Sequence, residues 1–261
     1  MFRGNYNFFE YKYNITGYSG QDFGGFPQQL YLAISIALII ILLVLLRKSS
    51  REMVLKIIRA VSIFLVVFYL AKTTWESIYD IRLSGSFNTG LLPFDTCSIV
   101  MLAGVIAGFG KGKIKKMAEA WLATGGIVGG IAAMIFLNAF KYYPFLSFGA
   151  FYSMIWHFLM VFLGLLLIVT KYVDIDFSTI NRGYLFHVIA SLVVIPIDFI
   201  FDFDFMLYRY LGGVPFFESI AENLISLNLG WLNPLIMLIL YYIAFNIVFI
   251  IPLAIDKLRK R

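Results

Sequence analysis

Two side chains in this sequence could together perform nucleophilic chemistry, namely Cys97 and His157. Cys97 is the only cysteine in the 261 residues, and His157 is one of two histidines. A thiol with an imidazole base is the minimum needed for acyl transfer through a thioester. A lone buried cysteine is also a common small hydrophobic residue. The pair therefore predicts chemistry only if the fold brings the two residues together.

Cys97 follows Pro93 by about one helical turn, and we expect Pro93 to begin a helix. Proline suits the first turn of a helix because its missing N–H group needs no partner there. The positive end of the helix dipole would then favour a thiolate at Cys97. Asp95 could interact with the same dipole, orient the base, or weaken the nucleophile through its negative charge.

The composition is that of an integral membrane protein. Hydrophobic residues make up 61% of the sequence, charged residues only 14%, and the mean hydropathy is +0.86. These values lie outside the range of soluble globular proteins. We expect an all-α, polytopic membrane helix bundle with seven transmembrane helices, at residues 29–46, 54–79, 92–109, 117–138, 148–170, 183–201 and 234–255. The expected domains are an extracytoplasmic N-terminal flap at 1–28, the seven-helix transmembrane domain at 29–256 and a basic cytoplasmic tail at 257–261.

The basic residues indicate how these helices are oriented. Most of the 21 Lys and Arg residues lie in the first, third and fifth connections and in the C-terminal tail. By the positive-inside rule that face is cytoplasmic, so the N-terminus lies outside and the C-terminus inside. We therefore expect a plasma-membrane protein whose active site faces the extracytoplasmic side, and no nucleic-acid partner for its basic runs.

Charged residues inside the predicted helices are candidates for a site, because charge in hydrocarbon usually faces a bundle interior or a wet cavity. Lys72, Glu76 and Asp80 recur at a four-residue spacing on one stripe of the second helix. They could line a cavity or neutralise one another as an ion pair. Asp198 and Asp202 share one face of the sixth helix, and we expect Asp198 to pair with Lys72 or Arg82.

The remaining histidine and the small residues suggest structural roles. His187 is predicted to lie near the cytoplasmic interface. Two histidines so far apart in sequence do not form a standard zinc spacing, and we expect neither a metal nor a cofactor. The glycines predict close packing of the third and fourth helices through G-x-x-x-G pairs at 104/108, 125/129 and 126/130.

Several motifs resemble those of the YwaF-like integral membrane proteins. Residues 92–97, Leu-Pro-Phe-Asp-Thr-Cys, resemble the family's Leu-Pro-x-x-x-Cys helix start. Residues 148–157 follow an aromatic-proline turn and resemble its aromatic segment ending in histidine. Residues 204–207, Pro215 and residues 229–234, Leu-Gly-Trp-Leu-Asn-Pro, resemble its closing signature. The chain departs from the pattern at Asp95, where a histidine or another neutral residue is frequent, and at Leu232-Asn233 between the tryptophan and the proline.

The family has animal relatives of the transmembrane protein 164 type, among them a phospholipid acyltransferase that works through a cysteine and a histidine. The resemblance implies these roles for Cys97 and His157. We therefore expect a membrane-embedded acyltransferase or transacylase that moves a fatty acyl chain between membrane phospholipids or to a lipid-linked acceptor. The residues expected to bind the substrate or orient the base are Asp95, Lys72, Glu76, Asp80, Asp198, Asp202 and Asn233.

Two functions of other classes fit the same sequence. A transporter, or a protein that binds a cation or a small polar ligand, would use the intramembrane carboxylates of Glu76, Asp80, Asp198 and Asp202 together with Lys72. The second half of the chain is not a copy of the first, as it is in many transporters. A scaffold that assists membrane-protein assembly would need none of these side chains.

Overall fold

The computed structural model describes residues 6–15, 20, 24–136, 139–174, 176–211 and 215–259. Within these residues the fold is entirely helical, which confirms the predicted class. The helices are α1 (Phe26–Leu46), α2 (Arg51–Ser84), α3 (Ile99–Phe109), α4 (Gly112–Trp121), α5 (Ile127–Ile135), α6 (Ala139–Tyr142), α7 (Phe148–Val169), α8 (Phe177–Phe201), α9 (Pro215–Ser226) and α10 (Asn233–Arg259). Short 3-10 turns lie at Thr89–Leu91, Thr96–Ser98, Phe205–Leu207 and Gly230–Leu232, and one π-turn, Leu122–Gly126, joins α4 to α5.

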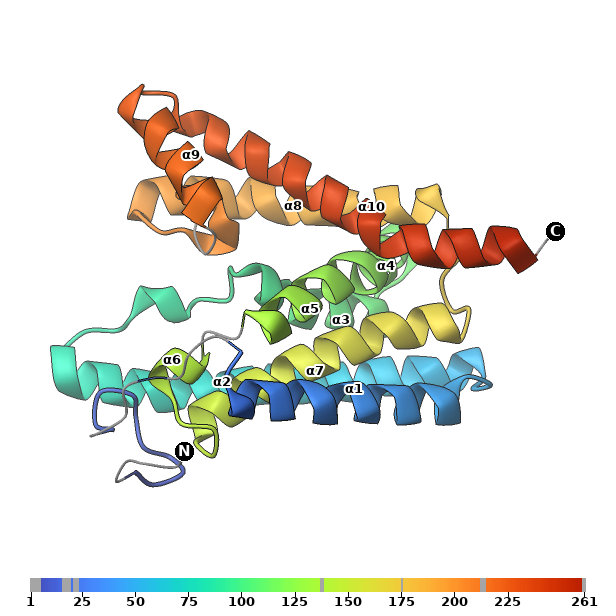
Figure 1. Cartoon of the computed structure of the whole chain (residues 1–261), viewed down its shortest axis with the longest axis horizontal. Helices are drawn as coiled ribbons and strands as arrows, with labels where there is room; N and C mark the ends of the chain where they lie inside the picture. Colours follow the sequence, from blue (N-terminus) through green and yellow to red (C-terminus); the bar gives the residue numbers. More distant parts are fainter. Residues whose placement is uncertain are drawn as a thin grey trace.

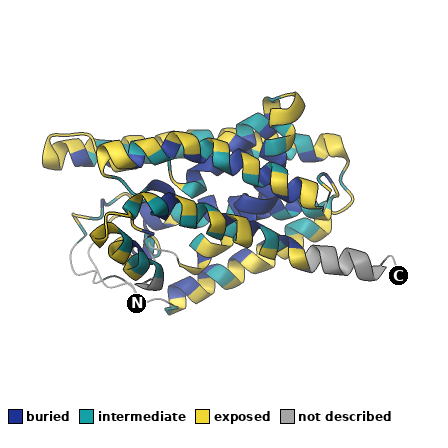
Figure 2. Cartoon of the chain, turned by 90° about the horizontal axis from the view of Figure 1, so that it is seen from above, coloured by how far each residue is buried: buried dark blue, intermediate teal, exposed yellow. Residues whose placement is uncertain are grey.

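Six helical stretches among the described residues are long and apolar enough to cross a membrane: Phe26–Leu46, Arg51–Ser84, Gly112–Tyr142, Phe148–Val169, Phe177–Phe201 and Gly230–Ile250. The predicted third span instead contains the shorter apolar helix Thr96–Phe109. Exposed residues follow the outward faces of the helices (Figure 2). They include large hydrophobic side chains such as Leu45, Leu192 and Ile200. Such faces suit contact with lipid rather than water.

The helices run roughly along one common axis, with α3, α4 and α5 lying between the α8–α10 pair and the group formed by α1, α2 and α7 (Figure 1). Helix α4 packs against α8, α2 against α3, and α5 against α7. We call the end at which α2 and α8 finish and α7 begins the α9 end, because α9 lies there. The opposite end, at which α2 and α8 begin, is called the basic end.

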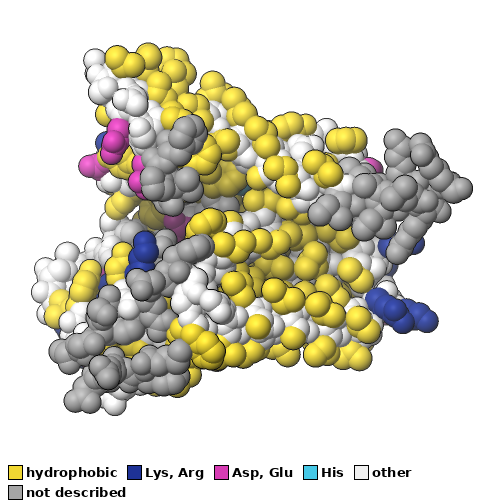
Figure 3. Space-filling view, in the orientation of Figure 1, with side chains coloured by type: hydrophobic (Ala, Val, Ile, Leu, Met, Phe, Trp, Pro, Cys, Tyr) yellow, Lys and Arg dark blue, Asp and Glu magenta, His cyan; other side chains and the backbone are white. Residues whose placement is uncertain are grey.

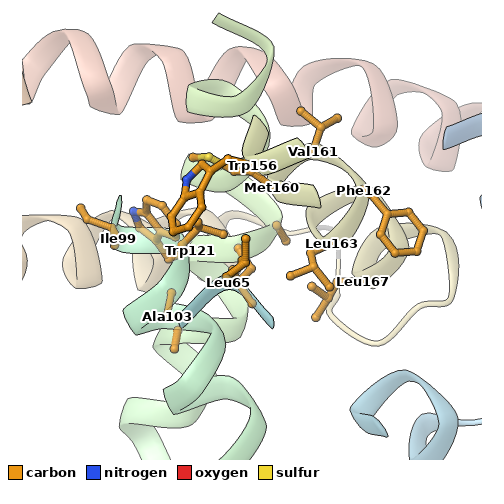
Figure 4. Close-up of a cluster of buried hydrophobic side chains, with 14 of the residues drawn as sticks. Leu65, Ile99, Ala103, Trp121, Trp156, Met160, Val161, Phe162, Leu163 and Leu167 are labelled. Carbon is orange, nitrogen blue, oxygen red and sulfur yellow. The ribbon is translucent and has the colours of Figure 1, made fainter. Parts of the chain in front are cut away.

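The core lies where these layers meet. Figure 4 shows the side chains of Leu65, Trp121 and Trp156 in one buried cluster with Ile99 and Ala103 of α3. Trp121 and Leu65 are fully buried. Large aromatic side chains of this kind remove the most surface from the surroundings and determine how closely the helices approach.

Gly108 and Gly130, which belong to two of the predicted pairs, lie at close helix contacts. A Cβ atom at Gly108 of α3 would lie 3.1 Å from Arg59 Cγ of α2. At Gly130 of α5 it would lie 2.6 Å from Val161 Cγ2 and 3.2 Å from Val161 N of α7. Missing side chains therefore let α3 approach α2 and let α5 approach α7.

The predicted start of the third helix is wrong. Pro93 lies in a turn, in which Phe94 N–H donates to Leu92 C=O at 2.9 Å, and Asp95 is extended (φ −65°, ψ 150°). The helical conformation begins with the turn at Thr96, and α3 itself begins at Ile99. The residue before a proline disfavours the helical conformation, and Leu92 is accordingly extended.

Candidate functional site

Cys97 lies in the helical turn Thr96–Ser98, and two other helices fix the position of that turn. The Trp156 indole N–H of α7 donates to the Cys97 carbonyl at 3.1 Å. The Thr96 hydroxyl lies 2.6 Å from the Tyr241 hydroxyl of α10, which in turn donates to Met206 C=O at 3.2 Å. The turn is therefore bonded to α7 on one side and to α10 on the other.

Polar and aromatic groups of α2 and α7 surround this turn. The Cys97 side chain is half-buried and interacts electrostatically with Asp95 and Lys72. Lys72 Nζ lies 5.5 Å from the centre of the Tyr152 ring, which contacts Trp156 at a ring separation of 5.3 Å. Cys97 thus has a cation and an anion within electrostatic reach, which is unusual inside an apolar bundle.

His157 follows Trp156 in α7, and its side chain is buried. Consecutive residues of an α-helix point about 100° apart, so His157 does not share the face on which Trp156 contacts Cys97. His157 Nδ1 lies 3.4 Å from Ser153 Oγ, and no hydrogen bond joins the ring to Cys97 in the described part of the chain. The structure therefore places Cys97 and His157 near the contact between the Thr96–Ser98 turn and α7, but the two side chains are not hydrogen-bonded to each other.

The stripe on α2 contains an ion pair. Lys72 Nζ lies 2.5 Å from Glu76 Oε2, and Glu76 also accepts a hydrogen bond from Tyr143 at 3.3 Å. Asp80, one turn further, accepts from the buried Tyr11 hydroxyl at 2.5 Å. Residues 6–15 thus contact the α9 end of α2, where a flap was predicted.

The acidic residues after α8 organise a loop. Asp198 is fully buried and accepts from Phe205 N–H at 2.9 Å, so the prediction of Lys72 or Arg82 as its partner is wrong. Asp202 lies 2.8 Å from Arg209 and is exposed. Asn233 is buried and donates to Arg209 C=O at 2.7 Å. The Asp198 carboxylate is bonded by the backbone of the loop that follows α8, so it does not require Lys72 or Arg82 as a partner.

The predicted interfacial position of His187 is also wrong, because this residue is fully buried. Trp121 N–H donates to its Nδ1 at 3.4 Å, and the Tyr208 hydroxyl lies 3.2 Å from its Nε2. Tyr208 also bonds Ser191, whose hydroxyl donates to His187 C=O at 2.7 Å. These bonds satisfy both ring nitrogens of a neutral imidazole, which indicates a structural residue.

Three residues of the site were not assigned a role from the sequence, namely Tyr152, Trp156 and Tyr241. Tyr152 and Trp156 share a face of α7 through their four-residue spacing, which is a signal available in the sequence. Tyr241 contacts Thr96 across 145 positions of the chain, and no local pattern indicates such a contact.

The α9 end of the molecule is hollowed. Figure 3 shows a recess between the α8–α10 side and the α2–α7 side, with acidic side chains on one wall and basic side chains on the other. Among the described residues, no three His, Cys, Asp or Glu side chains are grouped so that they could bind a metal ion.

Comparison with known families identifies the chain. The model of the TMEM164 family matches residues 23–255, which include Cys97 and His157. The chain belongs to the TMEM164 family. This confirms the resemblance inferred from the motifs around Cys97 and His157, and it agrees with the apolar helices in assigning the TMEM164-family chain to a membrane. Comparisons with curated proteins and with solved structures gave no match.

Proposed function

We propose that this TMEM164-family protein is an acyltransferase that moves a fatty acyl chain from a phospholipid to a second lipid through a thioester at Cys97. In the first step His157 takes the thiol proton and the sulfur attacks the carbonyl carbon of the ester. The ester C–O bond breaks, and the leaving lysophospholipid oxygen takes the proton from the imidazolium. In the second step an acceptor hydroxyl gives its proton to His157 and attacks the thioester. The C–S bond breaks, and the leaving Cys97 sulfur takes the proton back from the imidazolium.

One observation carries the proposal, namely the position of Cys97. The turn is fixed by hydrogen bonds from Trp156 and to Tyr241, and the residue after Trp156 is the histidine that the mechanism needs. Fixed positioning of a nucleophile supplies a large part of the rate in reactions of this kind. The helix Thr96–Phe109 begins at the nucleophile, so its dipole favours the negative charge that develops on the substrate carbonyl.

His157 must turn toward the sulfur for proton transfer. Among the described residues its ring bonds only to Ser153, through the hydroxyl at 3.4 Å and through the backbone. Catalytic hydrogen bonds are often long before the substrate binds and shorten in the complex. In the proposed mechanism, the bound ester displaces neighbouring side chains and the imidazole leaves Ser153 for Cys97.

Lys72 and Asp95 are the proposed contacts for the polar headgroup of the donor. Both interact electrostatically with Cys97, and Lys72 also interacts with Asp95. A lysine next to the thiol binds the phosphate of the donor phospholipid as a point charge. Glu76 keeps the lysine in place through their ion pair of 2.5 Å.

The proposal includes the orientation of the chain. The N-terminus lies outside the plasma membrane and the C-terminus inside, and the irregular residues 85–98 complete a seventh crossing together with α3. The distribution of Lys and Arg supports this orientation through the positive-inside rule. The α9 end of the molecule then faces outward. On that side the available acyl donor is phospholipid rather than cytosolic acyl-coenzyme A.

The test is a transfer assay with the purified chain in lipid nanodiscs. A phospholipid with a labelled acyl chain is the donor and an unlabelled lysophospholipid the acceptor. We expect Cys97→Ser and His157→Gln each to lower the initial rate by about 10²-fold or more, as for loss of a nucleophile or a general base. The exposed Glu52→Gln at the basic end is the matched control and should retain the rate.

The same assay separates catalysis from transport. If the protein is instead a transporter that uses these carboxylates, Glu76→Gln and Asp198→Asn should abolish transport and Cys97→Ser should leave transport unchanged. Each of these carboxylates already has a partner, Lys72 for Glu76 and Phe205 N–H for Asp198. A labelled product formed at the normal rate by Cys97→Ser would refute the proposed mechanism.

A further inference from the structure

The basic end of the molecule contains a polar pocket that the proposed acyl transfer does not use. The pocket has a volume of about 180 Å³ and lies between the beginning of α2, the middle of α4 and the connection from α7 to α8. Its lining includes Arg51, Lys116, Arg182, Glu119 and Asp174. The beginnings of α2 and α8, whose residues line it, lie at the opposite end of the bundle from α9 (Figure 1). A second site can therefore be argued independently of Cys97.

The charges of this pocket favour an anion. Arg51, Lys116 and Arg182 contribute three positive charges to the lining, and Asp176, 4.0 Å from Arg182, partly compensates one of them. Glu119 is paired with Lys115 at 3.0 Å, outside the lining, so its charge is compensated. Asp174 is the lining carboxylate that has no ion pair among the described residues. The net charge of the pocket is therefore positive.

Two helices also direct their N-terminal ends toward the pocket. Helix α2 begins at Arg51 with Ser50 as its cap, and α8 begins at Phe177 with Asp176 as its cap. Helices of 34 and 25 residues both have positive N-terminal ends. At α8 the carboxylate of Asp176 already accepts from Thr179 N–H at 2.7 Å and occupies this end. The dipole of α2, whose cap Ser50 is neutral, therefore adds to the side-chain charges and favours bound negative charge.

The walls of the pocket are ordered by contacts with buried residues. The Arg51 guanidinium lies 4.4 Å from the centre of the buried Tyr172 ring, and Arg182 donates to the buried Thr179 hydroxyl at 3.1 Å. Burial, the charge of Glu119 and a hydrogen bond to that carboxylate raise the pKa of Tyr172 to about 12, so its hydroxyl remains protonated at physiological pH. The arginines are thus held in position before any ligand arrives, which lowers the entropy cost of binding.

We propose that this pocket binds a phosphate group, either in a lipid headgroup or as the free ion. Arginine presents paired N–H groups that match the oxygens of phosphate, and lysine adds a point charge. The volume is below the ~300 Å³ at which typical small-molecule sites begin, so it admits a headgroup but not the acyl chains. The ends of apolar α2, α7 and α8 surround the pocket, which places it at the level of lipid headgroups.

The experiment measures thermal unfolding of the purified full chain by tryptophan fluorescence during titration with three probes. These are dihexanoyl phosphatidic acid, inorganic phosphate and dihexanoylglycerol, which has the same chains but no phosphate. We expect the phosphate-bearing lipid to raise the unfolding temperature and dihexanoylglycerol to leave it unchanged. If phosphatidic acid raises the unfolding temperature and inorganic phosphate does not, the pocket binds a lipid headgroup. If both raise it equally, the pocket binds the free phosphate ion.

Variants show whether the response comes from the pocket. Arg182→Gln and Lys116→Gln should each weaken the apparent affinity about tenfold, as for loss of one charge-assisted hydrogen bond. Lys48→Gln is the control, because this lysine is exposed at the same end but does not line the pocket. Asp174→Asn removes the opposing charge and should strengthen binding, a gain that misfolding would not produce.

Three outcomes would overturn the proposal. Dihexanoylglycerol could stabilise the protein as much as the phosphate-bearing lipid does. Lys48→Gln could weaken binding as much as Arg182→Gln, which would indicate diffuse attraction to the whole basic end. Asp174→Asn could leave the affinity for both phosphate probes unchanged. None of these readouts depends on acyl transfer at Cys97.

Discussion

Trp156 determines the position of Cys97 through the backbone rather than through the thiol. Its indole N–H donates to the Cys97 carbonyl at 3.1 Å, and its ring is buried against Tyr152. The carbonyl accepts this bond at the point where the helical turn begins, before the regular hydrogen bonds of α3 are established. Trp156 is therefore a positioning residue for the proposed nucleophile.

Trp156→Phe keeps an aromatic ring but removes the N–H donor. We expect the acyl-transfer rate to fall by about tenfold, because a small displacement of the nucleophile is costly in rate. The unfolding temperature should fall less than for a substitution that leaves a cavity. Initial rates in nanodiscs check this, with Trp231→Phe as the control, since Trp231 is exposed. Equal rates for the two variants would show that the Trp156 bond has no positioning role.

At the scale of single residues, the sequence indicates contacts between side chains that lie one helical turn apart. The four-residue spacing of Lys72 and Glu76 left open an ion pair or a cavity lining, and the structure shows the ion pair. The partner of Asp198 was predicted wrongly, because the loop after α8 folds back and supplies Phe205 N–H. That return depends on the left-handed conformation of Asp202 (φ 60°), which hydrophobic periodicity does not reveal.

Among the elements, helix ends explain most differences between prediction and structure. Helix α8 begins at Phe177, capped by Asp176, whereas residue 183 was predicted. His187 consequently lies ~15 Å along the helix at 1.5 Å per residue, instead of one turn from its end. The cap at Asp176 was visible in the sequence, but the basic Arg182 had been assigned to the connection. Apolar segments were thus predictable, while their polar first turns were not.

The contact between α5 and α7 is the element on which the site depends most, because α7 carries both Trp156 and His157. A Cβ atom at Gly130 would lie 3.2 Å from Val161 N and 3.4 Å from His157 O, and backbone atoms cannot move aside easily. We expect Gly130→Ala to destabilise the protein by about 1–3 kcal/mol, the usual cost of overpacking. Thermal unfolding in detergent measures the effect.

Gly126→Ala is the matched control for that substitution. A Cβ atom there meets its nearest neighbour at 3.7 Å, which is ordinary contact. The control should keep the unfolding temperature or raise it slightly, since alanine favours helix over glycine. If both variants unfold at the same temperature, the close approach of α5 and α7 does not require Gly130.

For the whole molecule, the family and the class of fold follow from composition and motifs, while the number of crossings depends on residues 85–109. Six long apolar helices are present among the described residues, and Thr96–Phe109 is shorter than a typical span. Hydropathy alone assigned this stretch as a regular span because it is apolar. The irregular turns at Thr89–Leu91 and Thr96–Ser98 interrupt it, since Pro93 and Asp95 favour extended backbone.

Accessibility of introduced thiols tests the orientation and the seventh crossing. In a Cys97→Ser background, Ser86→Cys lies after α2 and Lys113→Cys lies at the start of α4, both at exposed positions. In intact cells we expect an impermeant maleimide to label Ser86→Cys, and to label Lys113→Cys only after permeabilisation. Labelling of both from the same side would show that residues 87–112 do not cross the membrane.

The central claim is that Cys97 carries the acyl chain, and trapping the thioester tests it most directly. The purified chain is incubated with a phospholipid bearing a labelled acyl chain, denatured rapidly and examined by intact-protein mass spectrometry. We predict a mass increase of one acyl group that neutral hydroxylamine removes and that is absent from Cys97→Ala. Label that persists on Cys97→Ala, or that resists hydroxylamine, would contradict a thioester at this residue.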